Sequence, residues 1–161
     1  MVTLQPISES NFKAVLKLKA SDFVAPNDYS LTQAYLSLKE AIDENADFIW
    51  CEGPFAIMNN DEVVGFAMIT FEDGEDLDVG AEIFWISRVM IDEKHQKKGY
   101  GSKALEELVK FMRSEPDGCK AKYAYIAYSP ENMVAAKTYA KFGFEETGQL
   151  FHDEVVARLV L

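Results

Sequence analysis

The segment that most restricts the fold of this chain is an almost continuously apolar run at residues 83–91. A strand with one solvated face alternates apolar and polar residues, whereas a strand covered on both faces is apolar throughout. A second strand-like segment, rich in aromatic residues, lies at residues 121–128. Between them a helix is predicted by an apolar stripe at Leu105, Leu108, Val109 and Met112. This strand–helix–strand order predicts two parallel strands joined by a right-handed crossover.

Alternation and turn residues predict further strands on either side of this unit. These strands are expected at residues 2–7, 54–58, 63–71, 144–150 and 154–161. The polar residues 59–62 form a predicted hairpin turn between two of them. The chain is therefore expected to build an α/β (α+β) fold around one mixed sheet.

Three more helices are predicted from apolar periodicity. The first carries Phe12, Val15 and Leu16 on one face, and the second covers residues 31–42. Ser30 with Gln33 matches the capping-box pattern at the start of the second helix. The last helix lies between Pro130 and Gly143, the polarity that these two residues favour at helix ends.

The composition is that of an ordinary globular protein, with 48% hydrophobic and 27% charged residues among 161. Without repeats or long linkers, residues 1–161 are expected to form one domain. No signal peptide and no run of about 20 apolar residues is found, so a cytoplasmic protein without a membrane span is expected. Cys51 and Cys119 match no metal-ligand spacing, and in a reducing compartment both are expected to be free thiols.

The formal net charge of −11 makes nucleic acid an improbable partner, because a general nucleic-acid binder needs a basic face. The long-range field of such an acidic protein favours the approach of a cationic molecule. Many acidic proteins are acidic only for solubility, so this second inference is weak.

Against this acidic background, the segment from Lys94 to Lys103 contains four lysines and no acid. It links the buried strand to the following helix and places Gly99 and Gly101 at the helix start. Free N–H groups and the positive end of the helix dipole make such a start an anion site, and glycine lets a phosphate approach the backbone closely. A solvated lysine loop is the plainer reading, but the combination favours polyphosphate binding.

Two common phosphate-binding motifs fit poorly. Gly99-x-Gly101-x-x-Ala104 satisfies the loose dinucleotide fingerprint, but only 60 residues follow Gly101, too few for the second half of a doubly wound domain. The mononucleotide P-loop pattern Gly-x-x-x-x-Gly-Lys-Ser/Thr occurs nowhere.

The chain resembles the GNAT superfamily of acetyltransferases through two motifs. The first, Gln/Arg-x-x-Gly-x-Gly/Ala, is present from Gln96 to Gly101. The second, Asn-x-x-Ala-x-x-x-Tyr followed by Gly-Phe, is present as Asn132, Ala135, Tyr139, Gly143 and Phe144. The resemblance implies a central mixed sheet of about seven strands, with the fourth and fifth strands splayed apart, and about four helices. Residues 23–27, residues 91–93 and the C-terminal hairpin resemble bacterial diamine or polyamine (spermidine/spermine) acetyltransferases.

The resemblance implies that the co-substrate is acetyl-CoA and that no metal takes part. Its diphosphate would be held by N–H groups of the loop, and its pantetheine arm would pair with the edge of the fourth strand. An N–H group there, that of Val89, would stabilise the oxyanion. The residues implied in cofactor binding are Val89, Met90, Ile91, Gln96, Lys97, Lys98, Gly99, Tyr100, Gly101, Ser102, Asn132 and Ala135.

Tyr139 is the candidate general acid, because a phenol can give its proton to the departing thiolate. A plain core tyrosine is the alternative. The base is open: animal diamine acetyltransferases have an acidic pair where this chain has Ser87 and Arg88. The candidate acceptor-binding residues are Asn27, Asp28, Glu72 and Glu82. His95 is read as a surface residue, and the acidic run at residues 72–78 either attracts a polycation or only aids solubility.

The first-choice function is acetyl transfer to a small-molecule primary amine, a polyamine or diamine, within a ternary complex. Two alternatives stay open: an acetyltransferase for a protein or peptide amine, and a catalytically silent acyl-CoA-binding module. A homodimer is expected only by analogy with the family.

Overall fold

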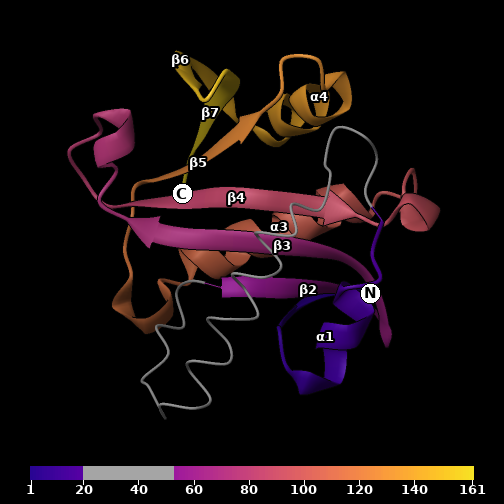
Figure 1. The fold of residues 1–161 in the computed structure, drawn as a ribbon. Coiled ribbons are helices and arrows are strands. Elements are labelled where there is room, and N and C mark those ends of the chain that lie inside the picture. The colour runs from indigo at the N-terminus through magenta and orange to yellow at the C-terminus, as the bar shows by residue number, and fades with distance from the viewer. Residues whose placement is uncertain (20–52) are drawn as a thin grey trace.

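The computed structural model describes residues 1–19 and 53–161 of the chain (Figure 1). In these two ranges seven strands and three α-helices alternate with short 3-10 turns. The strands are β1 (Val2–Pro6), β2 (Gly53–Asn59), β3 (Glu62–Glu72), β4 (Ile83–Ile91), β5 (Tyr123–Tyr128), β6 (Glu145–Phe151) and β7 (Glu154–Val160). The helices are α1 (Glu9–Val15), α3 (Tyr100–Arg113) and α4 (Met133–Phe142), and the 3-10 turns are η1 (Glu75–Leu77), η2 (Glu93–His95) and η3 (Pro116–Gly118).

All seven strands belong to one sheet in the order β1-β2-β3-β4-β5-β7-β6. The pairing is antiparallel throughout except between β4 and β5, which run parallel and are joined through α3. This confirms the mixed seven-stranded sheet and the parallel unit that the apolar run at residues 83–91 predicts.

Each face of the sheet carries its own apolar core. Leu105, Leu108 and Met112 of α3 pack against the face that also holds Phe84 and Ile86 of β4. Val15 of α1 and Leu18, three residues further along the chain, pack with Phe66 and Met90 on the opposite face. Figure 1 shows α3 behind the sheet and α1 in front of it.

A β-bulge at Ser87 divides β4 into two halves. Met68 of β3 pairs with Arg88 and the next residue, Ile69, pairs with Ile86, so Ser87 has no partner in the register. The bulge reverses the alternation of β4: Phe84 and Ile86 face α3 before it, and Val89 and Ile91 face α3 after it.

The bulge coincides with the point where β4 and β5 separate. Among the described residues their parallel pairing covers only three positions, the last between Ile86 and Ile126. Residues 88–91 therefore pair with β3 but with no described strand on the β5 side. The two strands diverge toward their C-terminal ends, and α4 lies beyond the opening (Figure 1). This is the splay that the family resemblance implies.

Several expectations need correction or fall outside the described ranges. Leu16 is 51% exposed rather than buried on the face of α1, because Val15 and Leu18 fill the core there. Cys119 is disulfide-bonded, so the expectation of a free thiol at this position is wrong; bonding between cysteines depends on tertiary proximity, which their spacing in the chain does not reveal.

The predicted helix over residues 31–42, its capping box and Cys51 lie outside the described residues. Within the described ranges no helix is both long and apolar enough to cross a membrane.

Candidate active site

The loop between β4 and α3 has the geometry of an anion site. Gly99 is the N-cap of α3 with φ 79°, a left-handed conformation that L side chains rarely adopt. The first N–H groups of an α-helix have no acceptor within the helix, and here no side chain caps them and no acid lies in the first turn. Lys97, Lys98 and Ser102 are exposed beside them. The predicted diphosphate-binding residues are therefore together and accessible.

Side chains hold this β4–α3 loop (residues 92–99) in place. Asp92 is 4% exposed, and its two carboxylate oxygens accept hydrogen bonds from the N–H groups of Lys94 at 3.1 Å and Lys19 at 3.2 Å. Gln96 donates from Nε2 to the carbonyl oxygen of Ile91 at 3.1 Å. The Gln of the first motif thus ties the loop to the end of β4.

The sequence predicted His95 to be a surface residue, but His95 is buried in η2, with only 7% of its surface exposed. Its Nε2 lies 3.2 Å from Oε1 of Glu62, and its ring centroid lies 6.2 Å from that of Tyr100. The sequence expectation was wrong because the turn between β2 and β3, which covers His95, is distant in the chain.

The edge of β4 beyond the bulge contains the residues predicted to meet the pantetheine arm. Val89 and Ile91 are partly buried toward α3, and Met90 is buried on the α1 face. A side chain at Gly65 would collide with the carbonyl oxygen of Met90, so glycine is needed for β3 to approach this edge. This part of β4 therefore pairs closely with β3 on one side and borders the splay on the other.

Tyr139 packs between Tyr128 of β5 and Phe144, with ring centroids 5.4 Å and 5.9 Å away. Burial, and then the neighbouring Tyr128 and Glu154, raise the pKa of Tyr139 to about 12. Among the described residues its hydroxyl has no hydrogen-bond partner, whereas that of Tyr128 donates to Oε1 of Glu146 at 2.9 Å. Tyr139 is thus a protonated phenol at neutral pH, and its O–H group is unpaired within residues 1–19 and 53–161.

Asn132 and Ala135, the other residues of the second motif, form the start of α4. Oδ1 of Asn132 accepts a hydrogen bond from the N–H of Ala135 at 3.1 Å, so Asn132 is the N-cap. Residues three and seven positions on lie on the same face of the helix, which puts Ala135 and Tyr139 in line with this cap. The motif therefore orients the helix that carries Tyr139.

Two charged residues that sequence reasoning did not single out as site residues, Arg88 and Glu154, interact electrostatically near the splay. Arg88, just past the bulge, is half-buried; burial lowers the pKa of its guanidinium and the charge of Glu154 opposes that shift. Glu154 begins β7, next to Val155, which pairs with Tyr128. It also acts electrostatically on Tyr139. No local pattern marks Glu154, because its position depends on the pairing of β7 with β5.

The predicted acceptor residues lie elsewhere or outside the described ranges. Glu72 pairs with Ile83 at the start of β4, and exposed Glu82 precedes that strand, so both lie at the end of β4 away from the diphosphate loop. Between them, the acidic run is anchored by buried Leu77. Asn27 and Asp28 lie outside the described residues.

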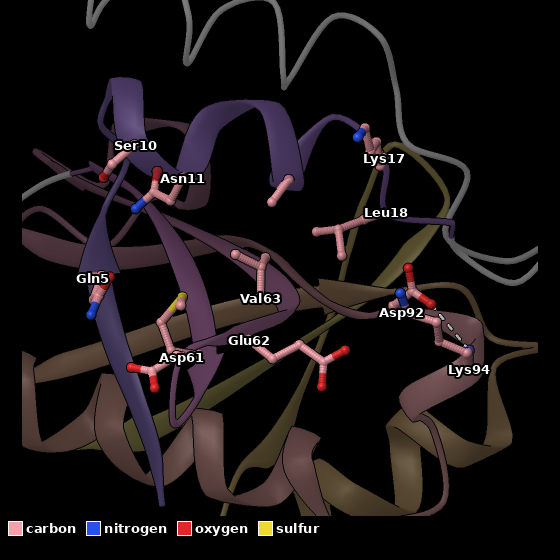
Figure 2. A pocket seen from close by; sticks show the side chains of 12 residues that line it. Gln5, Ser10, Asn11, Lys17, Leu18, Asp61, Glu62, Val63, Asp92 and Lys94 are labelled. Carbon is pink, nitrogen blue, oxygen red and sulfur yellow. Dashed lines mark hydrogen bonds between the residues drawn. The ribbon is translucent and has the colours of Figure 1, made fainter.

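An open pocket of about 510 Å³ lies between α1, the turn between β2 and β3, and the β4–α3 loop (Figure 2). Figure 2 shows Asp61 and Glu62 on one wall, Asn11 on α1, Lys17 just after that helix, and Asp92 beside Lys94. Both amide ends of Asn11 are already bonded, to Pro6 and Ser8. In the described residues no group of three or more His, Cys, Asp or Glu side chains could hold a metal ion.

The sheet with its splayed strands, the uncapped helix start and the tyrosine beside the splay are the features of a known acetyltransferase family. Residues 13–144 match the acetyltransferase (GNAT) family. The chain belongs to this family, and the protein is an N-acetyltransferase whose co-substrate is acetyl-CoA.

One curated relative is the spermine/spermidine N(1)-acetyltransferase of Bacillus subtilis (strain 168), 28% identical over 156 residues, which cover 96% of this chain and 95% of the relative. Among solved structures, the fold is similar to that of the aminoglycoside acetyltransferase AAC(6')-Ib in complex with coenzyme A, with a TM-score of 0.72, 24% identity and coverage of 99% and 95%. It is also similar to that of the PaiA N-acetyltransferase of Thermoplasma acidophilum with coenzyme A, with a TM-score of 0.71, 12% identity and coverage of 100% and 99%.

Proposed function

We propose that this protein acetylates a primary amine of a polyamine or diamine, with acetyl-CoA as donor. The observation that carries this proposal is the full-length similarity to a spermine/spermidine N(1)-acetyltransferase. The acidic balance of the chain supports it, because a field of this sign favours the approach of a polycation. The charge of Glu154, which acts on both Arg88 and Tyr139, supports it further, since a carboxylate near these residues can bind an ammonium group.

We propose the following roles for the residues at the splay. The first-turn N–H groups of α3 and the lysines beside them hold the diphosphate, with Val89, Met90 and Ile91 along the pantetheine arm. The neutral amine attacks the thioester carbonyl carbon, a C–N bond forms and the C–S bond breaks. The departing sulfur takes the proton of the Tyr139 hydroxyl, which is available because this phenol is protonated and unpaired among the described residues. The proton that the attacking nitrogen loses on forming the amide then restores the phenol.

The amine must lose a proton before it attacks, since an alkylammonium group has a pKa of about 10. Glu154 acts electrostatically on Tyr139, whereas Glu72 and Glu82 lie at the end of β4 away from the diphosphate loop and stay predictions as acceptor-binding residues. Asn27 and Asp28 stay predictions of the same kind. A peptide amine is the second candidate acceptor, because an acidic surface also suits basic peptides.

A panel of acceptors tests the proposal. Thioester consumption is measured with acetyl-CoA and, in turn, spermidine, a diamine, a lysine peptide, an aminoglycoside and no acceptor. We expect kcat/KM to be highest with spermidine or the diamine. A higher value with the peptide or the aminoglycoside would overturn the polyamine assignment. Tight coenzyme A binding without turnover on any acceptor would instead favour a silent binding module.

A further inference from the structure

Two contacts join the turn between β2 and β3 to the β4–α3 loop and to the first residue of α3. In the loop, Nε2 of His95 lies 3.2 Å from Oε1 of Glu62. At the start of α3, Nδ2 of Asn59 donates to the hydroxyl oxygen of Tyr100 at 3.2 Å. Residues 96–99 lie between these two points of attachment, which we call the turn clamp (Asn59–Tyr100 and Glu62–His95).

The turn itself is well anchored. The terminal ammonium of Met1 donates to Oδ1 of Asn60 at 2.9 Å and to Oδ1 of Asn59 at 3.4 Å. In return, the N–H of Asn60 donates to the carbonyl oxygen of Met1 at 3.1 Å. β1 and β3 pair with β2 on its two sides. The clamp therefore connects the loop to a fixed point of the sheet.

The β4–α3 loop needs such attachment because it is poorly held by its own backbone. An anion site requires unpaired N–H groups, so these groups cannot also fix the loop in the free protein. Lys97 has φ 60° and Gly99 has φ 79°, both in the left-handed region. For a residue with a Cβ this conformation is unfavourable and persists only where the surroundings hold it.

The contact with Glu62 is the one close polar contact that Nε2 of His95 makes among the described residues. Nε2 of His95 is buried and makes no hydrogen bond of good geometry within the described residues. The side chain of Glu62 is 59% exposed and lines the open pocket (Figure 2), so it can be replaced without opening the core. Replacing Glu62 would therefore remove its contact with the buried imidazole of His95 and leave the packing of the core unchanged.

We propose that Asn59 and Glu62 are positioning residues for the coenzyme A diphosphate. They hold His95 and Tyr100 and thereby preset residues 96–99 and the first turn of α3 that follows them. Preorganisation of this kind lowers the ordering cost of binding and so increases affinity. The proposal rests on acetyl-CoA as co-substrate and is independent of which amine is acetylated.

A simple charge effect predicts the opposite result, which makes the proposal testable. Glu62 is an acid near an anion site, so its long-range charge opposes phosphate binding, and its removal alone would tighten binding. Loss of a positioning contact would weaken binding. Asp61, the neighbouring acid in the same turn, has no polar contact with the loop among the described residues and provides the matched charge control.

The experiment compares Glu62→Ala, Glu62→Gln and Asp61→Ala with the natural protein. For each, Kd for coenzyme A is measured by calorimetry, and KM and kcat are measured with acetyl-CoA and with S-acetylpantetheine, a donor that lacks the diphosphate. For Glu62→Ala we expect Kd and KM for the coenzyme to rise about fivefold at unchanged kcat, the size expected from one modest polar contact.

We expect Asp61→Ala to leave Kd equal or lower, and Glu62→Gln, which keeps an oxygen beside His95, to give an intermediate value. Kinetics with S-acetylpantetheine are expected to be the same in all variants. The proposal is overturned if Glu62→Ala binds coenzyme A as tightly as the natural protein or more tightly. It is also overturned if S-acetylpantetheine kinetics suffer equally, which would indicate general loosening. A failed polyamine assignment would leave the calorimetric result untouched.

Discussion

At the scale of single residues, the surroundings of Tyr139 fit a proton donor better than a proton acceptor. Burial against Tyr128 and Phe144 disfavours the charged phenolate and raises the pKa of Tyr139 to about 12. The conjugate acid of a departing thiolate has a pKa of about 8.5, so proton transfer from Tyr139 to sulfur is uphill by itself. In the proposed reaction the transfer is completed because the nitrogen, on forming the amide, returns a proton to the phenolate.

Replacing Tyr139 with Phe keeps the ring packing and removes only the hydroxyl. We expect kcat to fall by about 10²-fold, the lower range for loss of a general acid, with Kd for acetyl-CoA changed less than twofold. Steady-state kinetics with the best acceptor of the panel and calorimetry with acetyl-CoA measure the two effects. Unchanged kcat would show that Tyr139 is only a core residue.

At the scale of secondary-structure elements, two local irregularities shape the site. The bulge at Ser87 shifts the alternation of β4 and precedes its separation from β5. The cap at Asn132 fixes where α4 begins, and α4 carries Tyr139 toward the splay. Neither is part of the apolar core, yet each determines where a reacting group lies.

We expect Asn132→Ala to lower the free energy of unfolding by about 1 kcal/mol, the usual cost of removing an N-cap acceptor. Asn132→Ser keeps a capping oxygen and is expected to retain most of the stability. Urea unfolding measures both. If Asn132 also contacts the cofactor, as the second motif implies, Asn132→Ser will raise KM for acetyl-CoA while remaining stable. Equal stability of the Ala and natural proteins would contradict the capping role.

At the scale of the whole molecule, two tyrosines link stability to alkaline pH. Burial and the hydrogen bond to Glu146 raise the pKa of Tyr128 to about 12, and the pKa of Tyr139 is also about 12. In the unfolded chain both return to the ordinary value of 10.0. Above that pH the unfolded state loses protons that the folded state retains. The stability present below pH 10 is therefore progressively lost up to about pH 12.

Each of these tyrosines is expected to reduce the free energy of unfolding by up to about 1.4 kcal/mol per pH unit in this window. Urea unfolding at closely spaced pH values between 9 and 12 measures the slope (about six points suffice). Tyr128→Phe and Tyr139→Phe are each expected to flatten it, and the double variant to flatten it further. The same slope in all four proteins would show that neither phenol resists ionisation in the folded state.

The sequence alone determined the order of the elements, the parallel unit around residues 83–91, the glycine at the start of α3 and the tyrosine on α4. These follow from periodicity, turn residues and motifs, which act between residues close in the chain. Only the tertiary structure decided that His95 is buried, that Ser87 is bulged and that the charge of Glu154 acts on Tyr139. Each of these depends on strand register or on a turn packed from far along the chain, and no local pattern encodes such pairings.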